Sequence, residues 1–432
     1  MRSSNFNNKI KLLGASAVAV IASLAGCEGQ APDKGELFNR FGTVTTGDPA
    51  LVGALGVGPG GNVLTNAQVE QEVIAVIASA RVRLQVAFED LESQAVAQSL
   101  IDAQRRGVDV RVVGDVDRRE QSGFRLLTDP GAGLKDNGDG LPPVVFGDGA
   151  LSYSPAPTTE VARSGDQNLM THNFVIADDV RVYNLTGGFI DEGRPVAQIG
   201  FDAISEDIAK DFGDEFNQMY GGMFATTLSA FNGPLKTNTN SRTHYPNDIG
   251  DLEVFFGPQE RLMKRLIDDI YGARASVFVV TESFTNTFVA DALRYKAENG
   301  FKVGVVVNRE NRDVPFSRVD NIRTLFDGIR EGQGDDTLPD LRLTSGVHLN
   351  MVIIDAEPSP INKARYKTRV YVLSEPILES ISFNNNGDGT EARPADAFSD
   401  ANMWTLTRTA VAPEPNVDRF INLFEFLFNQ GE

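Results

Sequence analysis

The amino-acid sequence predicts an α/β protein whose folded part consists of two similar halves. Apolar residues at helical spacing alternate along the chain with short apolar runs typical of buried strands. This order of helix, strand, helix and strand occurs twice. The second copy follows the first at a constant spacing of 193 residues. Ala80 and Ala273 are separated by this interval (273 − 80), and so are Gly107 and Gly300 (300 − 107). Such units, joined by short turns, form mixed sheets covered by helices.

Each expected element rests on its own local pattern. In the first copy, apolar residues every three or four positions predict a helix over 69–80, and alternation predicts a strand over 82–88. A helix over 94–105 ends before Gly107, and a strand follows at 108–113. The second copy repeats these elements as helix 262–271, strand 276–280, helix 288–298 and strand 302–307. Closing helices are expected at 208–220 and 417–428, so the halves span 67–224 and 251–432, with a polar connection at 225–250.

The N-terminal residues have the layout of an export signal. Residues 1–26 combine a basic start, a short apolar run over 12–24 and small residues before Cys27. This arrangement resembles the lipobox of bacterial lipoproteins, which implies that Cys27 becomes the lipidated first residue and anchors the protein in a membrane. Glu28 follows Cys27 in place of the Asp that commonly retains such proteins at the inner membrane, so we expect the outer membrane. Residues 27–66 are rich in Gly and small residues and are expected to form a flexible tether.

Composition limits the classes of function. Apolar residues make up 41% of the chain, which is enough for a sizeable core, and the formal net charge is −19. So acidic a chain is not expected to bind nucleic acid, because that binding depends on basic side chains that replace counterions. With one Cys and three His, a metal site of the Cys or His type is not expected, and no cofactor motif is found.

Two of the three histidines fall at similar places in the two copies. His172 precedes Asp179 by seven positions, and His348 precedes Asp355 by the same interval, with mostly apolar residues between. A strand-like segment follows each motif, at 181–185 and at 369–373. The spacing between these segments is 369 − 181 = 188, and it pairs Thr186 with Ser374 and Asp191 with Glu379.

This arrangement resembles the phospholipase D superfamily, whose signature is His-x-Lys-x4-Asp, present twice and followed by Gly-Ser-x-Asn. The resemblance covers nearly all of the folded chain. It implies two phospholipase D-like halves related by a pseudo-twofold axis, with both motifs in one cleft. One His would attack phosphorus and form a phosphohistidine, and the other would protonate the leaving oxygen. The catalytic residues carried over are His172, His348, Asp179 and Asp355.

The active-site signature is incomplete in this sequence. Phe174 and Asn350 stand where the resemblance requires lysines, so only Asn350 is left to donate a hydrogen bond to phosphate. Thr186 and Ser374 stand in the degenerate Gly-Ser-x-Asn stretches and are the other candidate phosphate-binding residues. Arg181 and Arg369 are matched between the copies, and they could either replace the lysines or pair with Asp.

Several acidic residues have two interpretations. Asp191 and Glu379 could orient a histidine or cap a helix, and the His–Asp pairs could be retained for catalysis or for buried hydrogen bonds that hold the fold together. Asp115 and Asp117 follow a strand and are expected to lie in a solvated turn.

The sequence therefore favours a phospholipase D-like envelope lipoprotein with impaired catalysis, which binds a phosphate-bearing ligand, such as a phosphodiester or a phospholipid, or a partner. The alternative is an active phosphodiesterase or phosphatidyltransferase that works through a phosphohistidine. Loss of both lysines favours the first hypothesis, and retention of two of only three histidines favours the second.

Overall fold

The computed structural model describes residues 40–45, 63–64, 66–147, 170–189, 198–223, 243–244, 251–257, 259–314, 317–333, 339–377, 401–408 and 415–432. All of these belong to one compact unit, Gly35–Glu432. The expected signal sequence 1–26 and the candidate residues Cys27, Asp191 and Glu379 lie outside the described residues. Within the described ranges, no helix is both long enough and apolar enough to span a bilayer.

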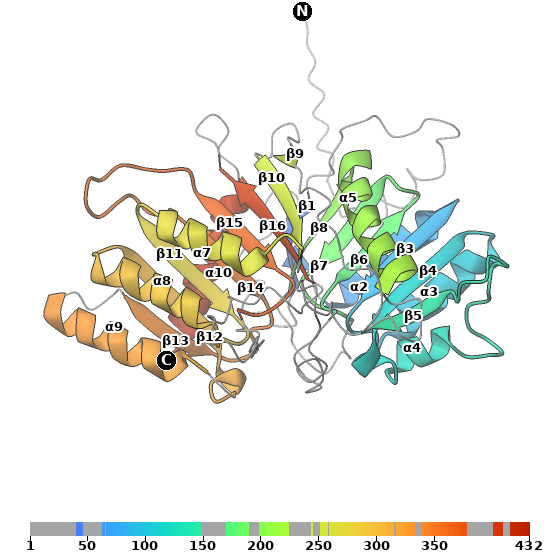
Figure 1. The fold of residues 1–432 in the computed structure, drawn as a ribbon, viewed down its shortest axis with the longest axis horizontal. Helices are drawn as coiled ribbons and strands as arrows, with labels where there is room; N and C mark the ends of the chain where they lie inside the picture. The colour runs from blue at the N-terminus through green and yellow to red at the C-terminus, as the bar shows by residue number, and fades with distance from the viewer. Residues whose placement is uncertain are drawn as a thin grey trace, which may run out of the picture. The chain divides into compact units, whose positions relative to one another are not determined.

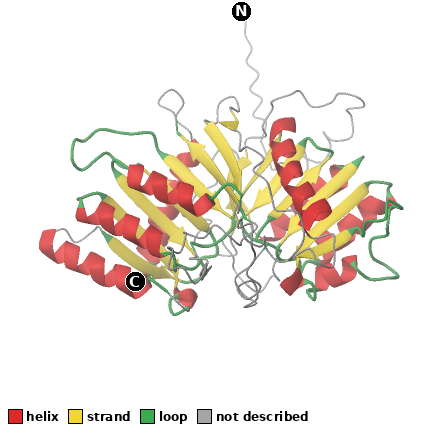
Figure 2. Ribbon diagram, in the orientation of Figure 1, coloured by secondary structure: helices red, strands yellow, loops and turns green. Residues whose placement is uncertain are grey.

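Two sheets of eight strands form the framework (Figures 1 and 2). The first has the order β2-β1-β8-β7-β6-β3-β4-β5, and the second has the order β13-β12-β11-β14-β15-β16-β10-β9. Read from β5 and from β13, the two orders match strand for strand. The strands of the first sheet are β1 (Arg40–Thr45), β2 (Val63–Leu64), β3 (Arg83–Phe88), β4 (Asp109–Asp115), β5 (Val144–Gly147), β6 (Asn173–Ala177), β7 (Arg181–Leu185) and β8 (Gln198–Ile204). Those of the second are β9 (Thr243–His244), β10 (Asp251–Phe256), β11 (Ser276–Thr281), β12 (Lys302–Asn308), β13 (Asp340–Thr344), β14 (Asn350–Ile354), β15 (Arg369–Leu373) and β16 (Asn402–Thr407).

Helices cover both faces of each sheet. The helices are α2 (Asn66–Ser79), α3 (Gln94–Arg105), α4 (Ser122–Leu127), α5 (Glu206–Asn217), α7 (Leu262–Gly272), α8 (Thr287–Glu298), α9 (Val319–Gln333) and α10 (Pro415–Gln430). In the second half, α7 and α8 pack on one face, and α10 packs on the other (Figure 1). Ser93 and Asn286, which are 193 positions apart, each cap the helix that follows by accepting a backbone N–H three residues on.

One apolar cluster includes residues of both halves. In this shared core, the rings of Phe201 and Trp404 lie 5.6 Å apart edge to face, and those of Phe212 and Phe256 lie 5.1 Å apart. Trp404 and all three phenylalanines are at most 1% exposed. Large buried aromatic side chains dominate the energy of a core, so the halves stabilise each other. The predicted α/β class with two similar halves is thus confirmed.

Part of the expected tether is a strand. Arg40–Thr45 forms β1 and pairs antiparallel with β8, as β10 pairs with β16 in the second half. Without β1, β8 would present unpaired backbone groups at the edge of the sheet. Part of the expected connection also joins a sheet, since Thr243–His244 pairs with β10. The repeat therefore extends beyond the boundary expected at residue 67.

The motif strands differ in register from the sequence alignment by one residue. The N–H of Asp178 bonds to the carbonyl of Arg83, and the N–H of Asp355 bonds to that of Ser276. Arg83 and Ser276 are counterparts, because 276 − 83 equals 193, so Asp355 corresponds to Asp178 and not to Asp179.

This shift reassigns the rest of the first motif. Asn173 becomes the counterpart of Asn350, Thr171 that of His348, and Leu349 that of His172. The adjacent acids Asp178 and Asp179 concealed the shift, and a slip of one residue turns every side chain of a strand to the opposite face.

The register predicts unequal roles for the two adjacent acids. The Asp178 carboxylate accepts the backbone N–H groups of residues 81–83, whereas Asp179 pairs with the exposed Arg83. We expect Asp178→Ala to lower the free energy of unfolding by about 2 kcal/mol. Asp179→Ala should change it by less than about 0.5 kcal/mol. Urea denaturation of both variants measures this, and equal losses would contradict the register.

Candidate functional site

The site lies where the parallel strands of the two halves end. Glu89 follows β3, Asp115 ends β4, and Glu282 follows β11 as the counterpart of Glu89. Asp115 is fully buried and accepts the backbone N–H of Met170 at 3.0 Å, so it does not lie in a solvated turn as expected. This bond holds the chain ahead of β6 against the end of β4.

Two asparagines position the backbone of the glutamates. Asn173 accepts the N–H of Glu89 through Oδ1 at 3.0 Å, and Asn350 accepts the N–H of Glu282 in the same way at 3.0 Å. Both asparagines are at most 2% exposed. Asn350 was expected to bind phosphate, but its amide oxygen holds the backbone. In the corrected register, both lysine positions of the phospholipase D signature are therefore occupied by Asn.

Glu89 is a carboxyl group in an acidic environment. Burial raises its pKa well above the usual value of 4.5, and the negative charges of Asp90 and Asp115 raise it further. The negative charge of Glu282 in the second half also raises the pKa of Glu89. The carboxyls of the two halves are therefore within electrostatic range of each other. A carboxyl with a raised pKa keeps its proton to a higher pH than a free glutamate does, and it can donate that proton while it holds it.

His348 is paired with a carboxylate and is accessible to solvent. Its Nδ1 lies 3.2 Å from Oε1 of Glu282, and the side chain is 27% exposed. Glu310 lies close by. Burial by itself would raise the pKa of Glu310, but hydrogen bonds, including one from the Gly346 N–H, and the charge of His348 lower it. Donation from Nδ1 to Glu282 leaves the imidazole lone pair on Nε2, where it could act as a base or a nucleophile.

His172 lies in a different environment from His348. It is completely buried, with Nε2 at 3.3 Å from Glu215 and Nδ1 at 3.1 Å from the Asn402 amide of the second half. Its ring also contacts Phe174 in the shared core. The counterpart of His172 is the core residue Leu349, so His172 occupies a core position and does not pair with His348 as the family mechanism requires.

The hydroxyl residues hold strand ends together. Ser374 accepts the backbone N–H of Asn402, and Thr186 accepts that of Ile199, which supports their expected equivalence. Ser374 also lies 3.1 Å from the Thr171 hydroxyl, which stands at the first histidine position of the signature in the corrected register. These oxygens hold strands and halves together, and phosphate binding by them stays a prediction.

The predicted catalytic aspartates lie at the opposite ends of their strands from the histidines. Asp179 pairs with Arg83, and Asp355 accepts the N–H groups of Arg274 and Ala275. Each lies beyond a five-residue strand, which spans roughly 17 Å at 3.3 Å per residue. Both aspartates order turns through these contacts, and a catalytic part for them stays a prediction.

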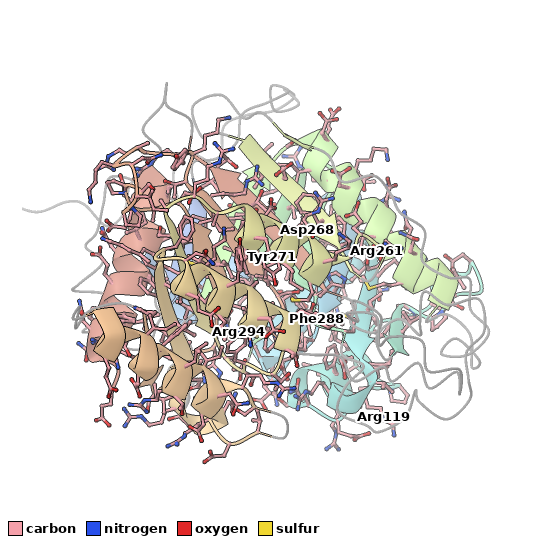
Figure 3. The ribbon with its side chains drawn as sticks, turned by 60° about the vertical axis from the view of Figure 1, so that its left-hand side comes forward. Arg119, Arg261, Asp268, Tyr271, Phe288 and Arg294 are labelled. Carbon is pink, nitrogen blue, oxygen red and sulfur yellow. The ribbon has the colours of Figure 1, made fainter. Side chains whose placement is uncertain are left out.

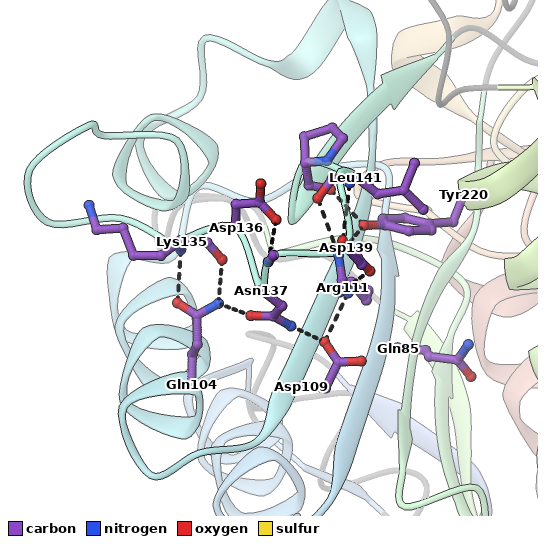
Figure 4. Close-up of polar contacts among 12 residues, drawn as sticks. Gln85, Gln104, Asp109, Arg111, Lys135, Asp136, Asn137, Asp139, Leu141 and Tyr220 are labelled. Atoms are coloured by element: carbon purple, nitrogen blue, oxygen red, sulfur yellow. Dashed lines mark hydrogen bonds and ion pairs between the residues drawn. The ribbon is translucent and has the colours of Figure 1, made fainter.

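Arg181 and Arg369, which could have replaced the lysines, are held by other groups, as is Arg111. Arg181 forms two bonds to Asp202, and Arg369 lies 3.3 Å from Asp269. Arg111, a buried arginine in β4, contacts Asp109, Asp139 and the hydroxyl of Tyr220 (Figure 4). Arg118 does reach the site. Its Nε lies 3.4 Å from Asp90, and its positive charge lowers the pKa of Glu89.

Across the described residues, no set of three His, Cys, Asp or Glu side chains is arranged to hold a metal ion.

Glu89, Glu282 and Arg118 were missed by the sequence analysis, although a signal for two of them was present. Glu89 and Glu282 are identical residues at the 193-residue spacing, and each directly follows a matched strand. Extending the repeat comparison by one residue past the strand would have found them. Arg118 has no such signal, because its counterpart in the repeat is Asn311.

Comparison with solved structures supports the fold. The chain is similar to phosphatidylserine synthase from Haemophilus influenzae Rd KW20, with a TM-score of 0.57 and 13% identity over 85% of each chain. Polyphosphate kinase from Porphyromonas gingivalis gives 0.47 at 12% identity, covering 84% of this chain and 49% of that one. The phospholipase D family member Nuc from Salmonella typhimurium gives 0.28 at 16% identity, covering 42% of this chain and 95% of that one. No protein-family model and no curated protein matches the sequence. At this identity, the similarity to phosphatidylserine synthase shows a shared fold.

The two histidines are expected to differ in their contribution to stability. His172→Ala removes a buried partner from Glu215 and Asn402, so we expect the free energy of unfolding to fall by about 3 kcal/mol. His348→Ala, at a partly exposed position, should cost less than about 1 kcal/mol. Thermal and urea unfolding of the two variants test this. A larger loss for His348→Ala would show that the assignment of core and site histidine is reversed.

Glu89 predicts that stability falls as the pH rises. Because its pKa is raised in the folded state, the folded chain keeps a proton that the unfolded chain releases above about pH 4.5. The associated stability is complete below that pH and is lost as the pH rises through the folded-state pKa. Glu89→Gln, which stays neutral, should flatten this decrease and be more stable than the wild type at about pH 8. Urea unfolding from about pH 5 to about pH 8 measures it, with the exposed Glu120→Gln as control. A parallel decrease in the Glu89 variant would refute the prediction.

Proposed function

We propose that the protein is a phospholipase D-like envelope lipoprotein that binds a phosphate-bearing ligand and lacks the two-histidine phosphohistidine reaction. The observation that carries this proposal is the corrected register. It puts Thr171 at the position matching His348, while His172 is buried in the shared core. Attack and leaving-group protonation by two imidazoles would then have no second imidazole in the site. The basic start, the apolar run and Cys27 support lipid anchoring, with the outer membrane as the proposed location.

The charges of the site suggest the class of ligand. Arg118 can donate hydrogen bonds to a phosphate oxygen, as can Glu89 and His348 in their protonated forms. Asp90, Glu282 and Glu310 surround them with negative charge, which disfavours a purely anionic ligand. A ligand with an ammonium group next to its phosphodiester satisfies both features, and the headgroup of an aminophospholipid has this chemistry.

Binding of two matched headgroups tests the proposal. Glycerophosphoethanolamine carries the ammonium group, whereas glycerophosphoglycerol has the same phosphodiester without it. We expect calorimetry to show tighter binding of the first, about tenfold weaker binding in Arg118→Gln, and no change in Arg119→Gln, which pairs with Glu120 on the surface. Equal binding of both ligands, or equal effects of the two arginine variants, would refute the proposed ligand.

A second function is supported by one observation. His348, paired with Glu282, supplies a nucleophile, and Glu89, whose pKa is raised by burial, supplies a proton donor in its protonated form. In this case, the protein would be a slow phosphodiesterase in which His348 is the nucleophile. Bis-p-nitrophenyl phosphate distinguishes the two functions, because turnover abolished by both His348→Ala and Glu89→Gln would establish catalysis. Under our proposal, wild type and His348→Ala show the same background rate.

A further inference from the structure

The loop between β14 and β15 is basic in an acidic protein. In the first half, Asp178–Val180 alone joins β6 to β7, whereas residues 355–368 join β14 to β15. The additional residues include Lys363, Arg365 and Lys367, while the chain as a whole has a net charge of −19. The insertion therefore brings concentrated positive charge to one end of the second sheet.

The loop has a defined structure of its own. The N–H of Ser359 bonds to the carbonyl of Ala364 at 2.8 Å, and the N–H of Lys363 bonds back to Ser359 at 2.9 Å. This closure presents Ile361 outward, with 68% of its surface exposed. The Arg274 guanidinium lies 5.2 Å from the ring centre of Tyr366, which supports the loop at its base. The loop thus holds an apolar tip beside basic side chains.

The acidic residues nearest in sequence to this loop are already engaged. Asp355 accepts backbone N–H groups, and Glu357 pairs with Lys302 at 3.2 Å. Lys363, Arg365 and Lys367 are exposed, and no residue in the part of the chain that the structure describes forms an ion pair with them. Their positive charges therefore have no acidic counterpart among the described residues.

Another exposed apolar area does not have this property. Tyr271 on α7 and Phe288 on α8 are partly exposed on the outer face of these helices. In Figure 3, Asp268 and Arg294 lie on the same face, so acidic and basic charges are mixed there. That arrangement therefore does not favour a partner of either charge.

We propose that the 355–368 loop docks the protein on an anionic lipid surface. Ile361 enters the boundary between headgroups and acyl chains, and Lys363, Arg365 and Lys367 lie over the headgroups. Basic residues near an anionic bilayer and an apolar residue inserted into its interface both favour binding. A nucleic acid would satisfy the charges but would leave Ile361 without an apolar environment. The loop lies at the far ends of β14 and β15 from His348, so this surface is independent of the proposed ligand site.

Vesicle flotation with the full chain tests the docking surface. The probes are phosphatidylcholine vesicles and phosphatidylcholine vesicles with about one third phosphatidylglycerol. Each basic residue is expected to contribute about fivefold, so Lys363→Gln/Arg365→Gln/Lys367→Gln should weaken binding to the anionic vesicles on the order of a hundredfold. Ile361→Ser should weaken it about tenfold. The triple variant should lose far less binding to neutral vesicles than to anionic vesicles. The N-terminal segment contributes equally to the binding of neutral vesicles in all variants.

A matched control removes the same charge elsewhere. Arg105→Gln/Arg119→Gln/Arg125→Gln changes three exposed arginines of the first half and should leave vesicle binding within about twofold. Wild-type binding by the loop triple variant, or an equal loss in the control, would overturn the proposal. It would also be overturned if the loop triple variant lost binding to duplex DNA and kept its binding to vesicles. Circular dichroism confirms that each variant is folded.

Discussion

The register of β6 and β14 against their neighbours determines which side chains reach the site. The backbone bonds from Asp178 to Arg83 and from Asp355 to Ser276 set this register in the two halves. Because strand side chains alternate between faces, a residue on β6 faces either the shared core or the outer layer. Hence His172 and Phe174 share the core face, whereas Asn173 turns towards Glu89. The assignment of the side chains in the site depends on this alternation.

The chemistry of the site differs from what the family signature implies. Asn173 and Asn350 use their oxygens to position the backbone of Glu89 and Glu282. Where the signature would place lysines that stabilise negative charge, this site gathers carboxyls. Burial, together with the charges of Asp90 and Asp115, raises the pKa of Glu89. A bare anion would meet like charge in such a site. The retained fold and the altered site are separate properties, since function depends on the site residues and not on the architecture.

The contacts between the halves give His172 a structural role. Glu215 accepts a bond from Gln259 of the second half at 2.7 Å and also pairs with His172, whose other nitrogen meets Asn402. Polar groups buried at a junction must be paired, and this cluster pairs them across both halves. The imidazole therefore contributes to holding the halves together. A histidine at a motif-like spacing is thus not by itself evidence for catalysis.

The sequence by itself determined the class of fold and the order of the elements, because helix and strand periods, the caps at Ser93 and Asn286 and the 193-residue repeat are local signals. It also predicted the equivalence of Thr186 and Ser374. It did not determine the register of the first motif, since Asp178 and Asp179 offered two alignments, and only hydrogen bonds between strands distinguish them. The tertiary structure likewise decided that β1 completes the first sheet, that Arg181 and Arg369 are held by aspartates, and that Glu89 lies near Glu282. These relations join residues that are far apart in the chain. They are established by strand pairing and by burial, and no local sequence pattern records either.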